Sequence, residues 1–314
     1  MGRIALMGTL IPIFNASTGL NTRIDPTRLV FDPEAGITDL AVAYNIDHDY
    51  TGRVSRRKGF EATGITSGSH SLYCDGGDAL VVIGTNLCLV ASDLSSTRAL
   101  ATVTENAPVD YAQVGDMIFW LNGHEKGFVR NQENHAWVKG TYYGPTSTRQ
   151  LSDPPVGTLL CAYKGRMWIA QGTVLFFSDP YSLNAFNLAH GFFPFEGDEI
   201  TMVRGVKAGM FVGTDDAVWF LEGNTPASFK PYKAARSGAF KGTAAYVDLS
   251  DLSPKEFLQN RTGEALVWTG PEGVSIGMPD GQVFHLTKDK HAQIQATDGG
   301  SCVIDGRYVC TLAP

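Results

Sequence analysis

The chain has 314 residues, of which 43% are hydrophobic, so it can bury a sizeable core and is not expected to be disordered. It has 25 Lys and Arg against 32 Asp and Glu residues, a formal net charge of −7, which argues against broad wrapping of nucleic-acid phosphates. Its 35 glycines and an aromatic content of 11% favour many short strands joined by tight turns.

Six segments of the chain share one pattern, in which an apolar strand, a glycine-containing turn and a second apolar strand follow one another. The glycines of these turns are Gly77, Gly115, Gly165, Gly209, Gly273 and Gly306, separated by 38, 50, 44, 64 and 33 residues. A period of about 40–50 residues with short strands is typical of β-propeller blades. The sequence therefore predicts an all-β chain with a single β-propeller of about five to six blades. A β-sandwich pair built from the same strands is the alternative.

The same pattern predicts an N-terminal arm over residues 1–35 and a propeller over residues 36–314. The longest separation, 64 residues, predicts a rim insertion at about 223–263, in which Pro254 opens one short helix over 254–260. The last unit lacks two strands. We expect the N-terminal segments 40–46 and 53–58, on either side of a turn, to close the ring, because an open ring leaves an exposed edge.

Two motifs invite a chemical interpretation, but their surroundings favour a structural one. Residues 273–277 match G-x-S-x-G, yet a turn and not a helix follows, so we predict that Ser275 is a strand serine. Asn45, Asp47 and Asp49 alternate like calcium ligands but lack the glycine and the glutamate of a calcium loop, so we predict a hairpin turn. We expect no catalytic residue, cofactor or metal site, and a protein that is not an enzyme.

The five cysteines include no C-x-x-C pair, which gives no support for a thiolate zinc site. Cys302 and Cys310 flank a turn at Asp305 and Gly306, where only a three-residue loop would place them opposite each other. We therefore expect free thiols, mostly buried. No apolar run reaches the ~18 residues of a membrane span, so no membrane span is expected.

One basic cluster stands out, formed by Arg53, Arg56, Arg57 and Lys58. In a strand, Arg56 and Lys58 share one face with Val54, and the other two basic residues share the opposite face. This pattern predicts a contact with an acidic partner subunit or with DNA phosphates. The alternative is an edge strand whose charges prevent wrong pairing.

Two parts of the chain resemble one family. In the N-terminal part, Gly-Leu-Asn at 19–21 and Ala-Tyr-Asn-Ile-Asp at 43–47 precede Gly-Arg-Val-Ser-Arg-Arg-Lys-Gly-Phe at 52–60. In the second part, Tyr-Lys-Gly-Arg-Met-Trp-Ile-Ala at 163–170 precedes Leu-Phe-Phe-Ser-Asp-Pro at 175–180 and Thr-Asp-Asp-Ala-Val-Trp-Phe-Leu at 214–221.

The two stretches that contain these runs, 19–60 and 163–221, span about a third of the chain. They resemble the tail nozzle, or DNA-stabilisation, β-propeller proteins of short-tailed bacteriophages. Asp179 and Phe186 stand where that family has Glu and Trp.

The resemblance implies a structural virion protein without catalysis. Members of the family form a ring, usually of six copies, below the portal and adaptor of the phage tail. The ring continues the channel for double-stranded DNA, retains the packaged genome and guides its ejection without sequence recognition. On this basis the expected location is the virion. The expected partners are copies of the chain itself in a hexamer, the portal and adaptor, and other tail proteins. We expect the insertion 223–263 and the arm 1–35 to carry the subunit contacts.

A carbohydrate- or receptor-binding β-propeller is the alternative function. Aromatic side chains that could stack on sugars occur in two clusters, which are Tyr142 and Tyr143, and Phe192, Phe193 and Phe195. Packing in the core or in an interface explains such clusters equally well.

Overall fold

The computed structural model describes residues 15–29, 31–32, 35–49, 51–59, 63, 65, 68–74, 79–140, 150–197, 199–252 and 261–313. These residues form an all-β structure, in which the described helices are three short 3-10 turns, η1 (Pro26–Arg28), η2 (Pro226–Ser228) and η3 (Leu249–Asp251). Among the described residues, no helix is long and apolar enough to cross a membrane.

Most of the chain is organised as successive antiparallel sheets, each made of strands that are consecutive in sequence. The first sheet consists of β6 (Ser69–Cys74), β7 (Ala79–Ile83), β8 (Asn86–Val90) and β9 (Thr97–Thr102). The second consists of β10 (Asp110–Val114), β11 (Met117–Leu121), β12 (Lys126–Arg130) and β13 (Glu133–Ala136). The third consists of β14 (Leu159–Tyr163), β15 (Arg166–Gln171), β16 (Val174–Asp179) and β17 (Ser182–Phe186), with β18 (Phe192–Pro194) also paired to β16.

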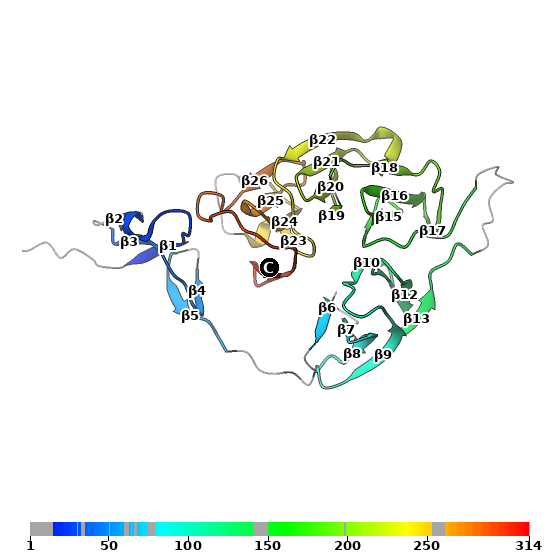
Figure 1. Ribbon diagram of the computed structural model, residues 1–314, viewed down its shortest axis with the longest axis horizontal. Coiled ribbons are helices and arrows are strands. Elements are labelled where there is room, and N and C mark those ends of the chain that lie inside the picture. Colours follow the sequence, from blue (N-terminus) through cyan, green and yellow to red (C-terminus); the bar gives the residue numbers. More distant parts are fainter. Residues whose placement is uncertain are drawn as a thin grey trace, which may run out of the picture.

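Two further sheets continue this order. The fourth consists of β19 (Ile200–Val206), β20 (Gly209–Thr214), β21 (Val218–Glu222) and β22 (Lys230–Ala235). The fifth consists of β23 (Ala245–Asp248), β24 (Glu264–Gly270), β25 (Gly273–Gly277) and β26 (Val283–His285). The five sheets follow one another around a common centre, and β6, β10, β19 and β23 lie nearest to it (Figure 1). The chain is a β-propeller, and this part of the sequence prediction is confirmed.

The turns between strands follow from the local sequence. Lys164 and Gly165 form a two-residue connection between β14 and β15, because Tyr163 pairs directly with Arg166. Both turn residues have positive φ, +48° and +71°. This is the backbone of the tight hairpin turn that suits twisted strands, and it explains why glycine recurs at these positions.

A separate hydrophobic core lies between each pair of consecutive sheets, and each of these four cores contains one buried tryptophan. Trp120 lies between the first and second sheets, Trp137 between the second and third, Trp168 between the third and fourth, and Trp268 between the fourth and fifth. None of these side chains is more than 2% exposed. Replacing a tryptophan buried in this way by alanine typically costs about 3–5 kcal/mol, so the order of the sheets is fixed mainly by these cores.

One ion pair links the innermost strands of three sheets. Asp110 begins β10, and its carboxylate lies 2.9 Å from Nη2 of Arg204 on β19. The same carboxylate accepts a hydrogen bond of 2.8 Å from the backbone N–H of Leu160 on β14, and Nη1 of Arg204 donates to the carbonyl of Leu160 at 3.2 Å. The side chains of Asp110 and Arg204 are only 15% and 19% exposed. The ion pair is therefore largely shielded from water, and each of its charges needs a partner there.

The strands at the two ends of the chain form smaller sheets. β1 (Ala16–Leu20), β2 (Phe31–Asp32) and β3 (Ile37–Leu40) form a three-stranded sheet, and β4 (Ile46–His48) and β5 (Val54–Arg56) form a hairpin. We call β1 to β5 the N-terminal module. β27 (Asp298–Ile304) and β28 (Arg307–Ala313) form another two-stranded sheet, the C-terminal hairpin, whose inner face packs against the fifth sheet. The N-terminal module lies to one side of the five sheets (Figure 1).

Several predictions about chain organisation need correction. Residues 40–46 and 53–58 were expected to complete the last sheet, but β4 and β5 pair with each other instead. The expected boundary at residue 35 falls inside one sheet, because β1 pairs in parallel with β3 across it. The region 223–263 is not simply an insertion, since it supplies β22 and β23 to two successive sheets. Two lysines and a proline in β22 conceal its strand pattern.

Other predictions fare differently. The helix expected over 254–260 lies outside the described residues. The five cysteines are free. Cys302 pairs with Val309 and not with Cys310, because the loop between β27 and β28 has two residues. Two of the cysteines, Cys74 and Cys302, are exposed, so the expected burial holds only in part. The number of blades stays a prediction.

The ion pair of Asp110 and Arg204 should be a principal source of stability. We expect Asp110→Ala to lower the free energy of unfolding by about 3–5 kcal/mol, because it leaves a buried guanidinium without its partner. The double variant with Arg204→Ala should cost less than the sum of the two single variants, and the difference should exceed 0.5 kcal/mol, roughly the lower bound for coupled residues. Denaturant unfolding of all three variants measures this.

The matched control is Asp116→Ala, which breaks the exposed pair of Asp116 and Arg130, whose atoms are 2.7 Å apart. Exposed pairs contribute about 0–1 kcal/mol. Equal losses for Asp116→Ala and Asp110→Ala would contradict the structural role assigned to the buried pair.

Candidate functional site

The basic residues singled out by the sequence lie on the hairpin of β4 and β5. The side chains of Arg53, Arg56, Arg57 and Lys58 are all exposed. Arg57 is partly engaged, because its Nε lies 3.5 Å from Oδ1 of Asp47. Arg56 and Lys58 form no ion pair with any described residue. The structure therefore places all four residues on this hairpin or directly beside it, and their division between two faces stays a prediction.

The hairpin turn is fixed by Asp49. Its carboxylate accepts hydrogen bonds from the hydroxyl of Thr51 at 2.6 Å, from the N–H of Thr51 at 2.9 Å and from the N–H of Arg53 at 3.0 Å. These bonds, that of the Thr51 hydroxyl first, hold the pKa of Asp49 below its usual range. The hairpin interpretation of this segment is confirmed. The carboxylate of Asp49 is bound by groups of the turn, and that of Asp47 lies in the ion pair with Arg57.

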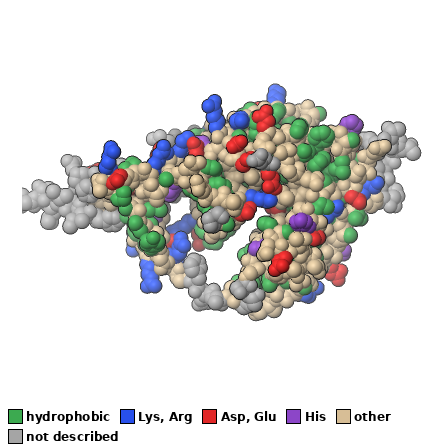
Figure 2. Space-filling model, viewed as in Figure 1, with side chains coloured by type: hydrophobic (Ala, Val, Ile, Leu, Met, Phe, Trp, Pro, Cys, Tyr) green, Lys and Arg blue, Asp and Glu red, His purple; other side chains and the backbone are tan. Residues whose placement is uncertain are grey.

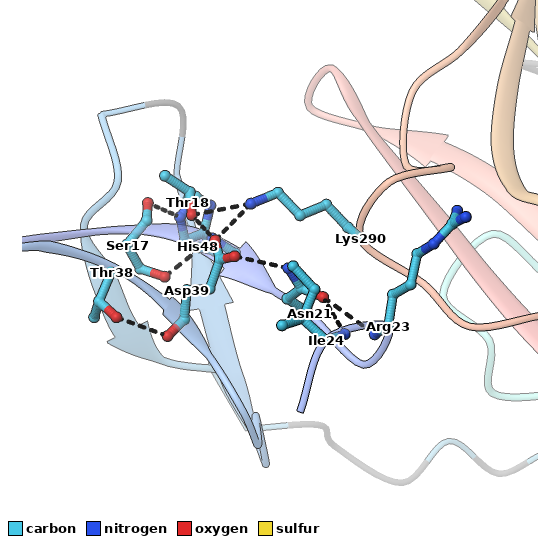
Figure 3. Close-up of polar contacts among 10 residues, drawn as sticks. Ser17, Thr18, Asn21, Arg23, Ile24, Thr38, Asp39, His48 and Lys290 are labelled. Carbon is cyan, nitrogen blue, oxygen red and sulfur yellow. Dashed lines mark hydrogen bonds and ion pairs between the residues drawn. The ribbon is translucent and has the colours of Figure 1, made fainter. Parts of the chain in front are cut away.

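A buried carboxylate joins the N-terminal module to the propeller. The side chain of Asp39 on β3 is fully buried and receives hydrogen bonds from the hydroxyl of Thr18, from the amide of Asn21 at 2.7 Å and from Nζ of Lys290 at 2.5 Å (Figure 3). Burial alone would raise the pKa of Asp39, but the hydrogen bonds from Lys290, Thr18 and Asn21 outweigh it, and the pKa lies below its usual range. This contact therefore stabilises the fold above the ordinary aspartate pKa of about 3.9. It is lost as the pH falls through the lower folded value.

Backbone groups extend the same contact. The N–H of Thr22 donates to the carbonyl of Lys290 at 2.8 Å, and the N–H of Ala292 donates to the hydroxyl of Thr22 at 3.2 Å. Nη1 of Arg23 donates to the carbonyl of Lys288 at 2.6 Å. We call this set of contacts, centred on Asp39 and Lys290, the clasp. It joins residues more than 250 positions apart in sequence, so it connects the start of the described chain to the segment between β26 and β27.

A small cavity of about 60 Å³ lies where the inner strands of four successive sheets begin. It is lined by Asp110, Thr158, Arg204 and Lys241, among others. Its charges are paired, because Asp110 binds Arg204 and Lys241 lies 3.4 Å from a carboxylate oxygen of Glu199. Ligand sites are usually about 300–1,000 Å³, so this cavity fits little more than water.

Ser275 and His285 come together, but the geometry is that of neighbouring strands. Ser275 lies in the middle of β25 and pairs in register with His285 on β26, which places the hydroxyl 2.9 Å from Nδ1. Nε2 of His285 is 4.0 Å from Glu272, too far for a hydrogen bond. Ser275 is 4% exposed. The prediction of a strand serine is confirmed, and this serine is not presented on the strand-to-helix turn that a nucleophile elbow requires.

The sequence indicated the basic hairpin but missed the clasp and the ion pair of Asp110 and Arg204. One signal was available for each, since Asp39 and Asp110 stand inside or at the start of apolar strands, where a carboxylate needs a buried partner. The identity of that partner was not visible, because Lys290 and Arg204 lie far away along the chain.

Comparison with known proteins gives no family. No family model and no curated protein matches this sequence. Among solved structures, the extracellular domain of a one component system from B. thetaiotaomicron shares 11% identity over 72% of this chain and 29% of its own, with a TM-score of 0.44. PorZ of the type-IX secretion system of Porphyromonas gingivalis shares 14% over 80% of this chain and 30% of its own, with a TM-score of 0.40.

A third solved structure, the β-propeller domain of Cps50 from Myceliophteria thermophila, shares 11% identity over 74% of this chain and 79% of its own, with a TM-score of 0.40. This chain spans less than a third of the length of the first two proteins. At TM-scores below 0.5 these similarities carry no inference about what this chain binds.

The clasp should open when Lys290 loses its charge. We expect Lys290→Met to increase the hydrogen-exchange rate of the Thr22 amide at least about tenfold, a loss of roughly 1.4 kcal/mol, because Asp39 is then buried without its cation. Hydrogen exchange followed by NMR or mass spectrometry measures this rate. The control is Lys288→Met, which removes only an exposed contact with Glu272. Unchanged protection at Thr22 in Lys290→Met would contradict the clasp.

Proposed function

We propose that this chain is a structural protein of a bacteriophage virion, a subunit of a nozzle-like ring. The ring would lie below the portal and adaptor, form part of the DNA channel, retain the genome and guide its ejection. The observation that carries this proposal is that the buried carboxylates bind partners within the fold and hold strands together. The main buried carboxylates, Asp39 and Asp110, hold strands together, and the central cavity has about 60 Å³.

The residues that carry the family resemblance support a structural role. Gly165 forms a tight turn, and Trp168 and Met167 lie buried in two different cores. A propeller stiffened in this way suits assembly by side-by-side packing, and a ring requires a heterologous interface that closes. The net charge of −7 suits the wall of a DNA conduit, because like charges keep the duplex from adhering.

A carbohydrate- or receptor-binding role remains the second candidate, and one groove favours it. The groove has a volume of about 440 Å³ and lies between the third and fourth sheets, beside Phe192, Phe193, His190 and Arg166. The ring of Phe192 is 40% exposed, which suits stacking on the apolar face of a sugar. The other aromatic pair considered from the sequence, Tyr142 and Tyr143, lies outside the described residues. Retention of a sugar in a glycan array, lost in Phe192→Ala, would favour this function.

The virion proposal predicts where the chain is found. Quantitative mass spectrometry of purified particles of the phage that encodes it should detect several copies of the chain per particle. Particles assembled without it should release their DNA prematurely, because the channel is no longer closed. Absence of the chain from purified particles, or particles that keep their DNA without it, would contradict the proposed function.

A further inference from the structure

The outer face of the C-terminal hairpin is an exposed apolar sheet face at one end of the described propeller. Its inner face contributes Val303 and Tyr308 to the core of the fifth sheet. On the outer face, Cys302 is exposed, Ile304 is 57% exposed and Val309 is 44% exposed. Cys302 and Val309 are directly opposite in the register, so these three side chains form one surface, which we call the C-terminal face.

The first sheet, at the other end of the propeller, has a smaller exposed apolar surface, where Leu72 of β6 is 67% exposed. Its outer face bears Val81, Cys88 and Val90, which are 3%, 5% and 5% exposed. Ile65, from the segment that leads into the first sheet, packs against them. The outer strands of the first sheet are therefore largely covered within the chain, and they leave less apolar surface for a partner than the C-terminal hairpin does.

A second apolar surface is found on the N-terminal module. Val42 is 63% exposed and Tyr44 is 85% exposed, in the segment that joins β3 to β4. Residues 53–58, which we call the basic strand, lie directly beside this segment, because the N–H of Arg57 donates to the carbonyl of Asn45 at 3.0 Å. We call Val42 and Tyr44 the N-terminal patch. Figure 2 shows hydrophobic side chains next to Lys and Arg side chains over the N-terminal strands.

The charges beside the two surfaces that form no ion pair with a described residue differ in sign. Arg307, opposite Ile304, is already paired with Asp47 of the same chain. The tip of the C-terminal hairpin carries exposed Asp305, and the exposed Asp251 lies beside Gly306 in the same turn. The N-terminal patch is flanked by Arg56 and Lys58, which form no ion pair with any described residue. Complementary charges of this kind set the orientation and the rate of association.

The two surfaces do not cover each other within one chain. Arg307 of β28 lies 3.6 Å from Asp47 of β4, so the N-terminal hairpin already rests against the C-terminal hairpin. Even so, Tyr44 and Ile304 remain exposed. In addition, β28 has only one strand partner among the described residues, and an open edge next to an apolar face invites association.

We propose that a second copy of this chain covers the C-terminal face, with its N-terminal patch packed on Ile304 and Val309 and its basic strand beside Asp305. The two surfaces are different parts of the molecule, so the contact is heterologous. Repetition of such a contact closes into a ring when the rotation between copies allows it. This inference rests on the proposed function, since it names the interface by which the ring assembles.

The test uses two variants of the full chain that each disable one surface, Ile304→Asp and Tyr44→Asp. Sedimentation or native mass spectrometry over a concentration series should show that the wild type associates. Each variant alone should associate at least about tenfold more weakly, because a charge is placed in an apolar contact. An equimolar mixture should form a 1:1 dimer with the affinity of a wild-type contact, because it retains one intact pair of surfaces. Equal melting temperatures establish that the variants fold.

The control is Tyr181→Asp, which changes a tyrosine that is 90% exposed in the turn between β16 and β17 and should leave association unchanged. A mixture that does not restore association, or variants that associate like the wild type, would overturn the interface. A monomeric wild type at every concentration would overturn it as well. The two proposals fail separately. A failed association test would not show that the chain is absent from virions, and absence from virions would not show that this contact does not form.

Discussion

Asp110 places a carboxylate in a largely desolvated position at the centre of the propeller, and three sheets meet around it. Its oxygens are occupied by the guanidinium of Arg204 and by the backbone N–H of Leu160. Each of these partners belongs to the innermost strand of a different sheet. Removing any one of them leaves another buried polar group without a partner, which costs more than the bond itself contributes. The relative positions of the second, third and fourth sheets are therefore mutually dependent.

The same constraint appears at the edge of the molecule. Asp39 is fully buried in the N-terminal module, and Lys290, in the segment between β26 and β27, supplies its counter-charge. In both ion pairs, a carboxylate on a short strand binds a cation from a distant part of the chain. Hydrophobic cores fix the order of the sheets, and these two ion pairs fix how particular strands meet. The two buried carboxylates thus hold distant parts of the fold together.

The local sequence pattern predicted many of the hairpins in this structure. It missed features that depend on residues far apart in the chain or on strands with an irregular pattern. The hairpins around Gly115, Gly165 and Gly306 were predictable because tight turns between short apolar strands have a strong local signature. β22 was not, because its alternation is hidden by charged residues and a proline. The pairing of β4 with β5 also overrode the expected ring closure, since a hairpin forms from neighbours without closing a long loop.

The candidate site also contains one part that the sequence predicted and one part that it did not. The basic strand was visible because its four residues are adjacent in sequence, whereas the clasp depends on a partner that no local pattern reveals.

The central claim is that three inner strands form one cooperative unit through Asp110 and Arg204. Native-state hydrogen exchange tests it most directly, because it reports the opening free energy of each strand separately. The amides of β10, β14 and β19, including that of Leu160, should exchange with a common opening free energy near that of global unfolding. Exchange from β10 at a much lower free energy than from β14 and β19 would contradict the claim.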